Sequence, residues 1–322
     1  MRYFARRLGV LVVTVVAAVA IAHVFLNTTV EGHRLASAIW GTPAYLFDGF
    51  VRGDFGATFG GGCLPRSGSV RPDEPAKPCA SYPAGEIDDL LRERVPVDLQ
   101  LLLGGLLFGT LAGVVGGRIC AMRRGSATAR LLHVATAFQL SCPPYFLAFL
   151  ILIYFADGSG TVLRLPFVSG VTDYVPLSQN PVRWLEAMWV PWLLCALPLA
   201  AFVLRITENA MREVLQEDYV RTARAKGLSS KRVSNRHALP VVTPGIAAMT
   251  SVNVSTLLIN VAVIEYAFGI PGLFRTIHAA SLTGDVPVLM GLVIEGVLLI
   301  TIANFLADAV QQMLDPRVRL QG

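Results

Sequence analysis

The basic segment from Arg221 to Pro240 is the part of the chain whose residue types and spacing best suit a recognition function. It reads RTARAKGLSSKRVSNRHALP, with small residues at positions 223, 225 and 227 inside a ring of positive charge, and it separates two stretches of membrane-length hydrophobicity. Small side chains let a short helix sit deep in a groove, while charges lie at its rim. We therefore expect a docking element for a soluble partner. The alternative is an ordinary positively charged loop with an amphipathic helix on the membrane surface.

The periodicity around this segment predicts two short helical elements. Apolar residues recur at three- and four-residue steps through Thr207–Lys226, with Arg and Glu between them, which is typical of an amphipathic helix. Gly227 ends this helix, because glycine adopts a positive φ freely. Ser229 or Ser230 caps a second, shorter helix, and Pro240 closes the loop at the membrane boundary.

The composition predicts an integral membrane protein. Of 322 residues, 54% are hydrophobic and 15% are charged, and the mean hydropathy is +0.57, whereas a soluble domain carries about 25% charged residues. A charge in hydrocarbon costs roughly 2.5–3.5 kcal/mol, which explains the deficit. The net charge of +5 does not indicate nucleic-acid binding, because Lys and Arg are enriched in cytoplasmic loops for orientation alone.

Six windows are long and apolar enough to cross a bilayer, which takes about 20 residues. We expect an all-α fold with six transmembrane helices and a kink in the third at the Pro143–Pro144 pair. The first window can alternatively be read as a cleaved signal peptide. The windows are Leu8–Asn27, Leu99–Gly117, Leu131–Phe155, Ala187–Leu204, Pro240–Ile264 and Val286–Ala307.

The distribution of charge predicts the orientation. Lys and Arg are concentrated at both ends of the chain and in the loops after the second and fourth windows, so both termini are expected in the cytoplasm. Residues 28–98, rich in Gly and Pro, are expected to form a mostly irregular external insert. Cys63 and Cys79 within it can form a disulfide, because the external compartment is oxidising; two free thiols are the alternative. No spacing typical of a metal site occurs in the sequence.

Three polar residues inside the windows are candidates for a translocation path. Glu295 lies near the middle of the last window, and intramembrane carboxyls are functional candidates by default. It can meet a substrate ammonium group, face a neighbouring helix, or bond to Asn253 or Asn260. The two asparagines belong to a polar stripe in the fifth window, which can line a wet path or hold helices together.

The basic loop resembles the signature loop of importer-type ABC permeases. That signature is a small-residue triplet, a glycine after three intervening residues and a terminal Leu-Pro, matched here by Arg221-Thr222-Ala223, Gly227 and Leu239-Pro240. Arg221 stands where the family usually has Glu, and His237 where it usually has an aliphatic residue. The stretch Asp218–Gly227 looks like the peptide-permease branch.

Further motifs along the chain agree with this resemblance. They are MRYFARRL at 1–8, RGDFG at 52–56, SCPPYFLAF at 141–149, FGIPGLF at 268–274 and the spaced Asn304, Asp308 and Asp315-Pro316-Arg317. Together they resemble the B-type subunit of dipeptide and oligopeptide importers over nearly the whole chain, the Cys63–Cys79 insert excepted.

The resemblance implies a single permease domain over 1–322, with 205–239 as the loop that couples to an ATPase. It implies a peptide importer in a bacterial inner membrane, with a second permease, two cytoplasmic ATPases and an external substrate-binding protein as partners. The chain has no GxxxxGK[ST] motif, so ATP and magnesium are expected on the ATPases, and this chain is not an enzyme. The coupling residues implied are Arg221, Thr222, Ala223, Arg224, Ala225, Lys226, Gly227, Leu239 and Pro240.

Other functions remain as alternatives. Related B-type permeases serve nickel or glutathione. An ion-driven secondary transporter would require buried charge pairs and inverted repeats, and the six windows contain only one acid, Glu295, and no evident repeat. An intramembrane enzyme is disfavoured because the sequence has neither HExxH nor GxSxG. A non-transporting membrane scaffold is the last alternative.

Overall fold

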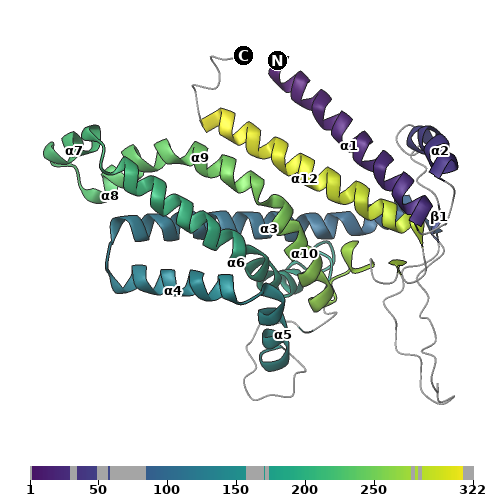
Figure 1. Cartoon of the computed structure of the whole chain (residues 1–322). Coiled ribbons are helices and arrows are strands. Elements are labelled where there is room, and N and C mark those ends of the chain that lie inside the picture. The colour runs from purple at the N-terminus through teal and green to yellow at the C-terminus, as the bar shows by residue number, and fades with distance from the viewer. Residues whose placement is uncertain are drawn as a thin grey trace. The chain divides into compact units, whose positions relative to one another are not determined.

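The computed structural model of the chain describes residues 2–29, 35–48, 57–58, 85–156, 170, 174–276, 280–281 and 285–314. These residues are almost entirely helical (Figure 1), apart from the two-residue strands β1 (Ala57–Thr58) and β2 (Gly85–Glu86), which pair antiparallel. Cys63 and Cys79 lie outside the described residues, so their disulfide stays a prediction. The chain divides into two compact units, one of Met1–Asp98 with Pro271–Thr301 and one of Leu99–Ile270 with Ile302–Gly322.

The first unit is built around α1 (Arg2–Thr29), α2 (Leu35–Phe47) and the part of α12 (Val286–Leu314) up to Thr301. Val15 and Val19 of α1 pack on Met290 and Ile294 of α12 in one buried cluster. The helix α2 was not expected, because the insert was predicted to be mostly irregular from its glycines and prolines. It forms because Tyr45 and Leu46 pack against the apolar cluster around Val19. His23 of α1 also bonds Thr42 (Nδ1–Oγ1, 3.1 Å) and stacks on Tyr45.

The start of α3 (Ile87–Met122) also belongs to the first unit. Ile87 and Leu90 pack with Leu273, Val288 and Leu292 in a second buried cluster. The short 3₁₀ helix η3 (Phe274–Thr276) follows Leu273 directly.

The second unit depends on close approach between α3 and α6 (Pro181–Val214). Glycines on α3 face α6 at every fourth residue, and a Cβ at any of them would lie within 3.0 Å of an α6 atom: Gly105, Gly109, Gly113 and Gly117. Small residues of this kind allow membrane helices to pack backbone to backbone. At the other end of the contact, Trp192 Nε1 donates to the Gln100 carbonyl at 2.9 Å.

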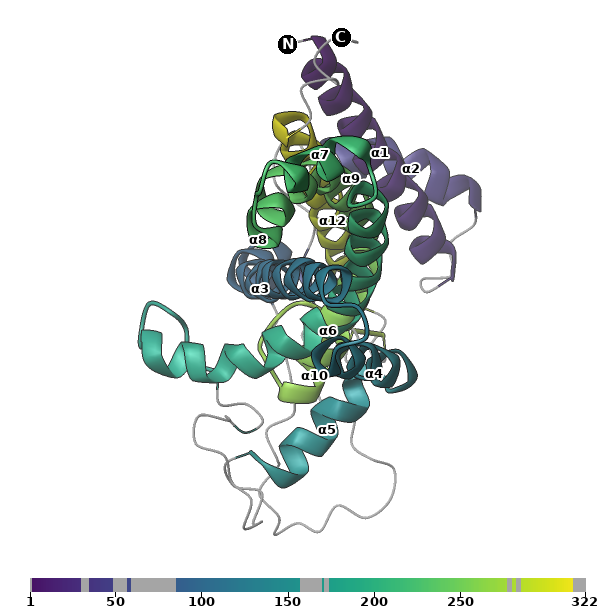
Figure 2. The same ribbon diagram turned by 90° about the vertical axis from the view of Figure 1, so that its left-hand side faces the viewer.

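Two of the expected membrane windows are broken helices. Helices α4 (Ala127–Ser141) and α5 (Pro144–Tyr154) meet at 97°, so α5 leaves the end of α4 in a new direction (Figures 1 and 2). Pro143 explains the break, because proline has no N–H to donate and disfavours helical geometry in the residue before it. The expected kink is confirmed and is large.

The second break lies between α9 (Leu239–Val252) and α10 (Val254–Phe268), since the segment Ser230–Thr250, which contains most of α9, is bent by 58° from α10. Among the described residues, three helices are long and apolar enough to cross a membrane, or up to five spans if each bent pair counts as one. The three helices are α1 (over Val12–Thr29), α3 (over Asp89–Met122) and α6 (over Pro181–Val214). The apolar part of α12, Val286–Ile302, is shorter, so the sixth span and the cytoplasmic location of the termini stay predictions.

Candidate functional site

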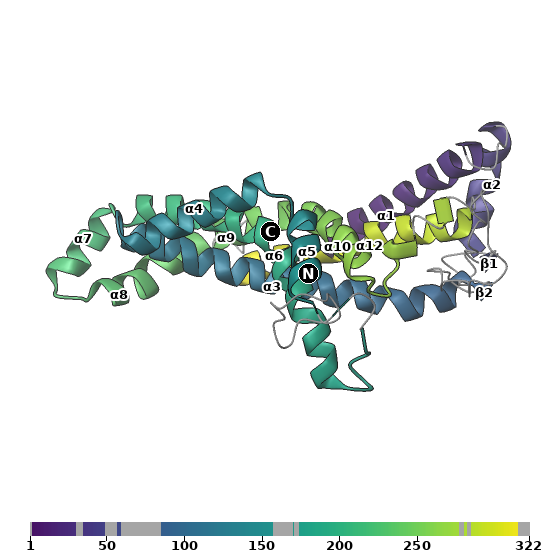
Figure 3. The same ribbon diagram turned by 90° about the horizontal axis from the view of Figure 1, so that it is seen from below.

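The basic segment folds as a separate projection at one end of the second unit, which we call the basic knob (residues 215–238). It contains α7 (Asp218–Ala225), α8 (Ser230–Val233) and a π-helical turn, η2 (Ser234–Ala238). In Figures 1 and 3 the helices α7 and α8 lie together beyond the corner that joins α3 to α4. The predicted single helix over Thr207–Lys226 is wrong, because α6 ends at Val214 and α7 begins at Asp218.

A small apolar core explains why the helix breaks there. Val220 and Val233 are fully buried and Ala223 is 7% exposed, and the three form one cluster. Val214, Leu215 and Leu228 pack against it. A straight continuation of α6 would carry Val220 and Ala223 away from this cluster and into water. The turn at 215–217 folds α7 back, so that its apolar face is covered by the knob itself.

Gly227 ends α7 as predicted. Its φ is +79°, the left-handed conformation that side chains with a Cβ rarely adopt. Its N–H donates to the Arg224 carbonyl at 2.9 Å, and the N–H of Leu228 donates to the Ala223 carbonyl at 3.3 Å. These bonds satisfy carbonyls that the end of the helix would otherwise leave open. A Cβ on Gly227 would meet nothing within 4 Å, so this position faces open space.

The knob continues into α9 without a flexible link. The N–H of Leu239 donates to the carbonyl of Ser234, five residues earlier, in the π-helical turn. Such a turn fits directly before Pro240, which has no N–H to offer to an ordinary helical bond. Arg118 of α3 donates to the Ser234 hydroxyl at 3.2 Å. The base of the knob is therefore fixed both to α9 and to α3.

The outer face of α7 is charged and exposed. Arg221 and Asp218 form a surface ion pair at 3.5 Å with side chains 71% and 97% exposed, and such a pair adds little stability. Partial burial, with the nearby Glu217 carboxylate, raises the pKa of Tyr219. The expected small-residue patch is divided: Ala225 and Gly227 are exposed, whereas Ala223 packs inward, because α7 needs it to cover Val233.

The asparagines proposed for a translocation path bond to their own helices. Asn253 Nδ2 donates to the Met249 carbonyl at 3.0 Å, and Asn260 Nδ2 donates to the Thr256 carbonyl at 2.9 Å. Asn253 also marks the bend between α9 and α10. Both asparagine side chains are partly exposed in the described structure.

Glu295 is 2% exposed on α12 and lies beside the buried carboxyl of Asp98 on α3. Within its unit the carboxyl thus faces a neighbouring helix. The windows contain one acid, but taking it as the only buried acid is wrong, because the windows were chosen as runs almost free of charge and so excluded the acids at or just beyond their edges. Four further acids are buried among the described residues: Asp98, Glu208, Glu265 and Asp285.

Comparison with known proteins shows the family to which the chain belongs. Residues 113–320 match the family described as the binding-protein-dependent transport system inner membrane component. The chain belongs to this family. It is therefore a multi-pass membrane permease of the ABC type, a transport component rather than an enzyme.

Proteins named as peptide-transport permeases are similar to this chain over most of its length. A Brucella abortus protein named as a peptide transport system permease is 31% identical over 233 residues, which are 72% of each chain. The dipeptide transport system permease DppB of Bacillus subtilis is 29% identical over 76% of this chain and 74% of its own. The oligopeptide transport system permease OppB of Mycobacterium bovis is 30% identical over 84% of this chain and 77% of its own.

The fold is also that of a solved transporter. An inward-facing structure of the MetNI methionine ABC transporter covers 70% of this chain and 96% of its own, with a TM-score of 0.52 and 19% identity. At that identity the likeness concerns the fold alone. The sequence resemblance to B-type permeases of peptide importers agrees with the family and with the names of the relatives.

Proposed function

We propose that the chain is one permease subunit of an ATP-driven peptide importer in a bacterial inner membrane, and that the basic knob is the surface on which a cytoplasmic ATPase docks. The observation that carries the proposal is the construction of the knob: a charged, exposed α7 held on its own apolar core and continuous with a membrane helix. A displacement of α7 would be transmitted to α9 through the helical turns of α8 and η2 rather than through a flexible loop.

The contacts at the base of the knob support this path. Val220 and Ala223 seat α7 on α8, and η2 leads from α8 into α9. The bond from Arg118 to Ser234 links the same point to α3. An ATPase that closes on nucleotide would move α7, and the two broken pairs, α4–α5 and α9–α10, are where the membrane helices would bend in response.

The partners follow from this reading. ATP and magnesium would be bound by two ATPase subunits, because this sequence has no phosphate-binding loop of its own. A second, similar permease would complete the path, and an external binding protein would deliver the substrate. Asn253, Asn260 and Glu295 stay candidates for the lining of that path.

Peptides are the proposed substrate class because relatives named for peptide, dipeptide and oligopeptide transport cover two thirds or more of the chain. Nickel or glutathione import by a B-type permease is the alternative within the same architecture. Uptake of labelled di- and oligopeptides, compared with labelled glutathione and ⁶³Ni²⁺, distinguishes these substrates in the reconstituted importer.

A photocrosslinking experiment tests the docking surface. A photoreactive amino acid at the exposed Ala225 is compared with the same group at Thr128, which is exposed at the start of α4 on the same predicted side of the membrane. We expect a crosslink to the ATPase from position 225 and a weaker one or none from position 128. Crosslinks from position 225 to lipid alone, in a complex that contains the ATPase, would contradict the proposal.

A further inference from the structure

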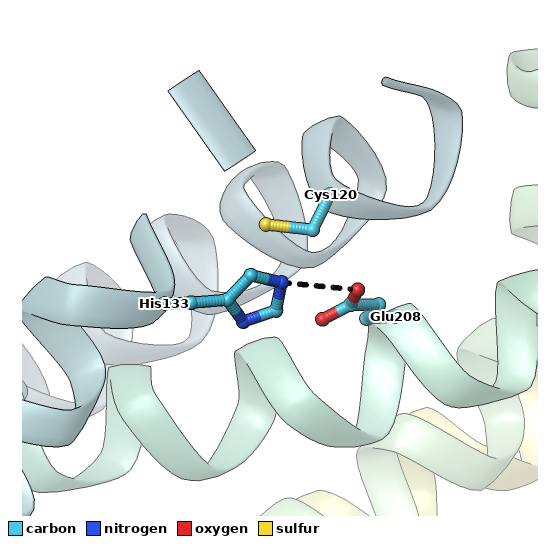
Figure 4. Close-up of side chains that lie close together, drawn as sticks. All are labelled: Cys120, His133 and Glu208. Atoms are coloured by element: carbon cyan, nitrogen blue, oxygen red, sulfur yellow. Dashed lines mark ion pairs between the residues drawn. The ribbon is translucent and has the colours of Figure 1, made fainter. Parts of the chain in front are cut away.

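Three side chains of different chemistry converge near the base of the knob. Cys120 lies near the end of α3, His133 lies on α4 and Glu208 lies on α6, and one ligand atom from each is within 4.8 Å of the others (Figure 4). His133 Nε2 is 3.4 Å from Glu208 Oε1, as the dashed line in Figure 4 marks. The sequence intervals of 13 and 75 residues form no metal-binding motif, so only the fold brings these groups together.

The close packing of α3 on α6 creates the cluster. A Cβ on Gly117 would lie 2.5 Å from the Leu204 carbonyl and 3.0 Å from the Glu208 nitrogen. With glycine there, the two backbones approach within one helical turn of Cys120. Cys120 and Ala129 are buried together with Leu204, which fixes the start of α4 at the same point.

We propose that Cys120, His133 and Glu208 bind a zinc-like divalent cation. Thiolate sulfur, imidazole nitrogen and carboxylate oxygen are the three donors that Zn²⁺ takes from proteins, at about 2.0–2.3 Å, and three protein ligands leave a fourth position for water. Donors at those distances from a tetrahedral ion lie roughly 3.3–3.8 Å apart, so the cluster has to contract by at most about 1.5 Å. Cys120 releases its thiol proton to solvent as the sulfur–metal bond forms.

The surroundings allow an ion to enter. Cys120 and Glu208 are buried, whereas the side chain of His133 is 46% exposed, so the rest of the chain does not seal the cluster on that side. Arg212, one turn along α6, contacts the same Glu208 oxygen. This guanidinium competes with the cation and has to move aside, which its partly exposed side chain (37%) can do. The bound ion would tie α3, α4 and α6 together ten residues before α7 begins.

Metal binding to the purified full-length chain tests the proposal without any transport assay. The protein carries a streptavidin-binding tag, so that no polyhistidine competes for metal. Co²⁺ serves as the spectroscopic probe, because a thiolate–cobalt bond gives a near-ultraviolet charge-transfer band. We expect that band at one equivalent of Co²⁺, its loss when Zn²⁺ displaces the cobalt, and its absence in Cys120→Ser.

Variants separate this site from other thiols. Cys142→Ser removes a free thiol beyond the end of α4 that does not belong to the cluster, and it should leave the band unchanged. His133→Ala should weaken Zn²⁺ binding at least tenfold, and this half-exposed position keeps the test valid if Cys120→Ser does not fold. Absence of the band in the wild-type chain, its persistence in Cys120→Ser, or unchanged affinity in His133→Ala would overturn the proposal. Either result leaves the docking function of the knob untouched.

Discussion

The carboxylate of Asp98 accepts a hydrogen bond from the backbone N–H of Leu273 at 2.8 Å, although 175 residues separate them. Both residues are fully buried. One turn earlier on α3, Arg94 donates to the Gly272 carbonyl at 3.5 Å. Gly272 and Leu273 belong to the FGIPGLF motif, so two side chains of one helix hold the backbone of that motif in place.

Replacing Asp98 should release this backbone. Asp98→Ala leaves the buried Leu273 N–H without its acceptor, a loss of about 1–3 kcal/mol. Hydrogen exchange at the Leu273 amide should therefore accelerate by roughly 10- to 100-fold. Asp98→Asn is the matched control, because its amide oxygen can still accept the bond, and it should keep most of the protection. Equal exchange in Asp98→Ala and the wild type would show that the bond does not hold the motif.

The glycines of α3 lead to a prediction about helix packing. Gly113→Ala places a Cβ 2.5 Å from Val203 Cβ and 2.9 Å from the Ala200 carbonyl, and a backbone atom cannot move aside as a side-chain tip does. We expect lower thermal stability, with a loss of about 1–3 kcal/mol, the usual range for overpacking.

A second helical glycine provides the control. A Cβ on Gly245 of α9 would meet nothing within 4 Å, so Gly245→Ala should be neutral or stabilising, as the helix propensities of Ala and Gly suggest. Thermal unfolding in the same detergent compares the two variants. If both lower the melting temperature equally, close packing at Gly113 does not explain the loss.

Local chemistry made some features of the fold predictable from the sequence. Gly227 has a positive φ and ends α7 because glycine is the residue that takes this conformation without strain. The break at Pro143 follows from the missing N–H of proline. The Leu-Pro pair marks the return to a membrane helix, which begins at Leu239. Each of these depends on neighbours within a few residues.

Features that depend on contacts between distant residues were not predictable. Val220 and Ala223 fold α7 back because Val233 offers them a surface, and no periodicity within α7 reveals that partner. The cluster of Cys120, His133 and Glu208 exists because glycines bring α3 against α6. The buried acids were missed for a different reason. The search for membrane windows looked for runs without charge, so each window ended before the charged residues beside it.

The core of the knob predicts how α7 can be loosened. Val220→Asp places a carboxylate at a fully buried position within the apolar cluster of the knob, and such a group is expensive to bury unless it is paired. We expect α7 to detach from α8, and hydrogen exchange over residues 218–228 to rise at least tenfold while the membrane helices keep their protection.

The neighbouring residue gives a matched comparison. Tyr219→Asp adds the same charge one position away, where the side chain is 45% exposed. The carboxylate stays in water there, so exchange over 218–228 should remain close to that of the wild type. If the two variants exchange alike, added charge rather than the lost apolar contact accounts for the change.

Gly227 offers a test of the proposed docking function. Gly227→Arg adds a long cationic side chain into open space at the end of α7, where it would obstruct an ATPase groove. We expect normal membrane insertion, with peptide uptake and substrate-stimulated ATPase activity in the reconstituted importer reduced at least tenfold.

Two controls separate obstruction from strain. Gly227→Ala imposes the unfavourable positive φ of +79° without the bulk, at a cost of about 1 kcal/mol, and should keep most of the uptake. Gly125→Arg imposes both strain and bulk at the α3–α4 corner, because Gly125 has a φ of +72° and open space around its Cβ position. Its uptake should stay near that of the wild type, since this corner lies outside the knob.

Loss of uptake in Gly227→Arg alone would mean that the surface at the end of α7 is occupied during transport. Equal losses in all three variants would mean that strain at a cytoplasmic turn is sufficient, and the docking surface would then have to be sought elsewhere.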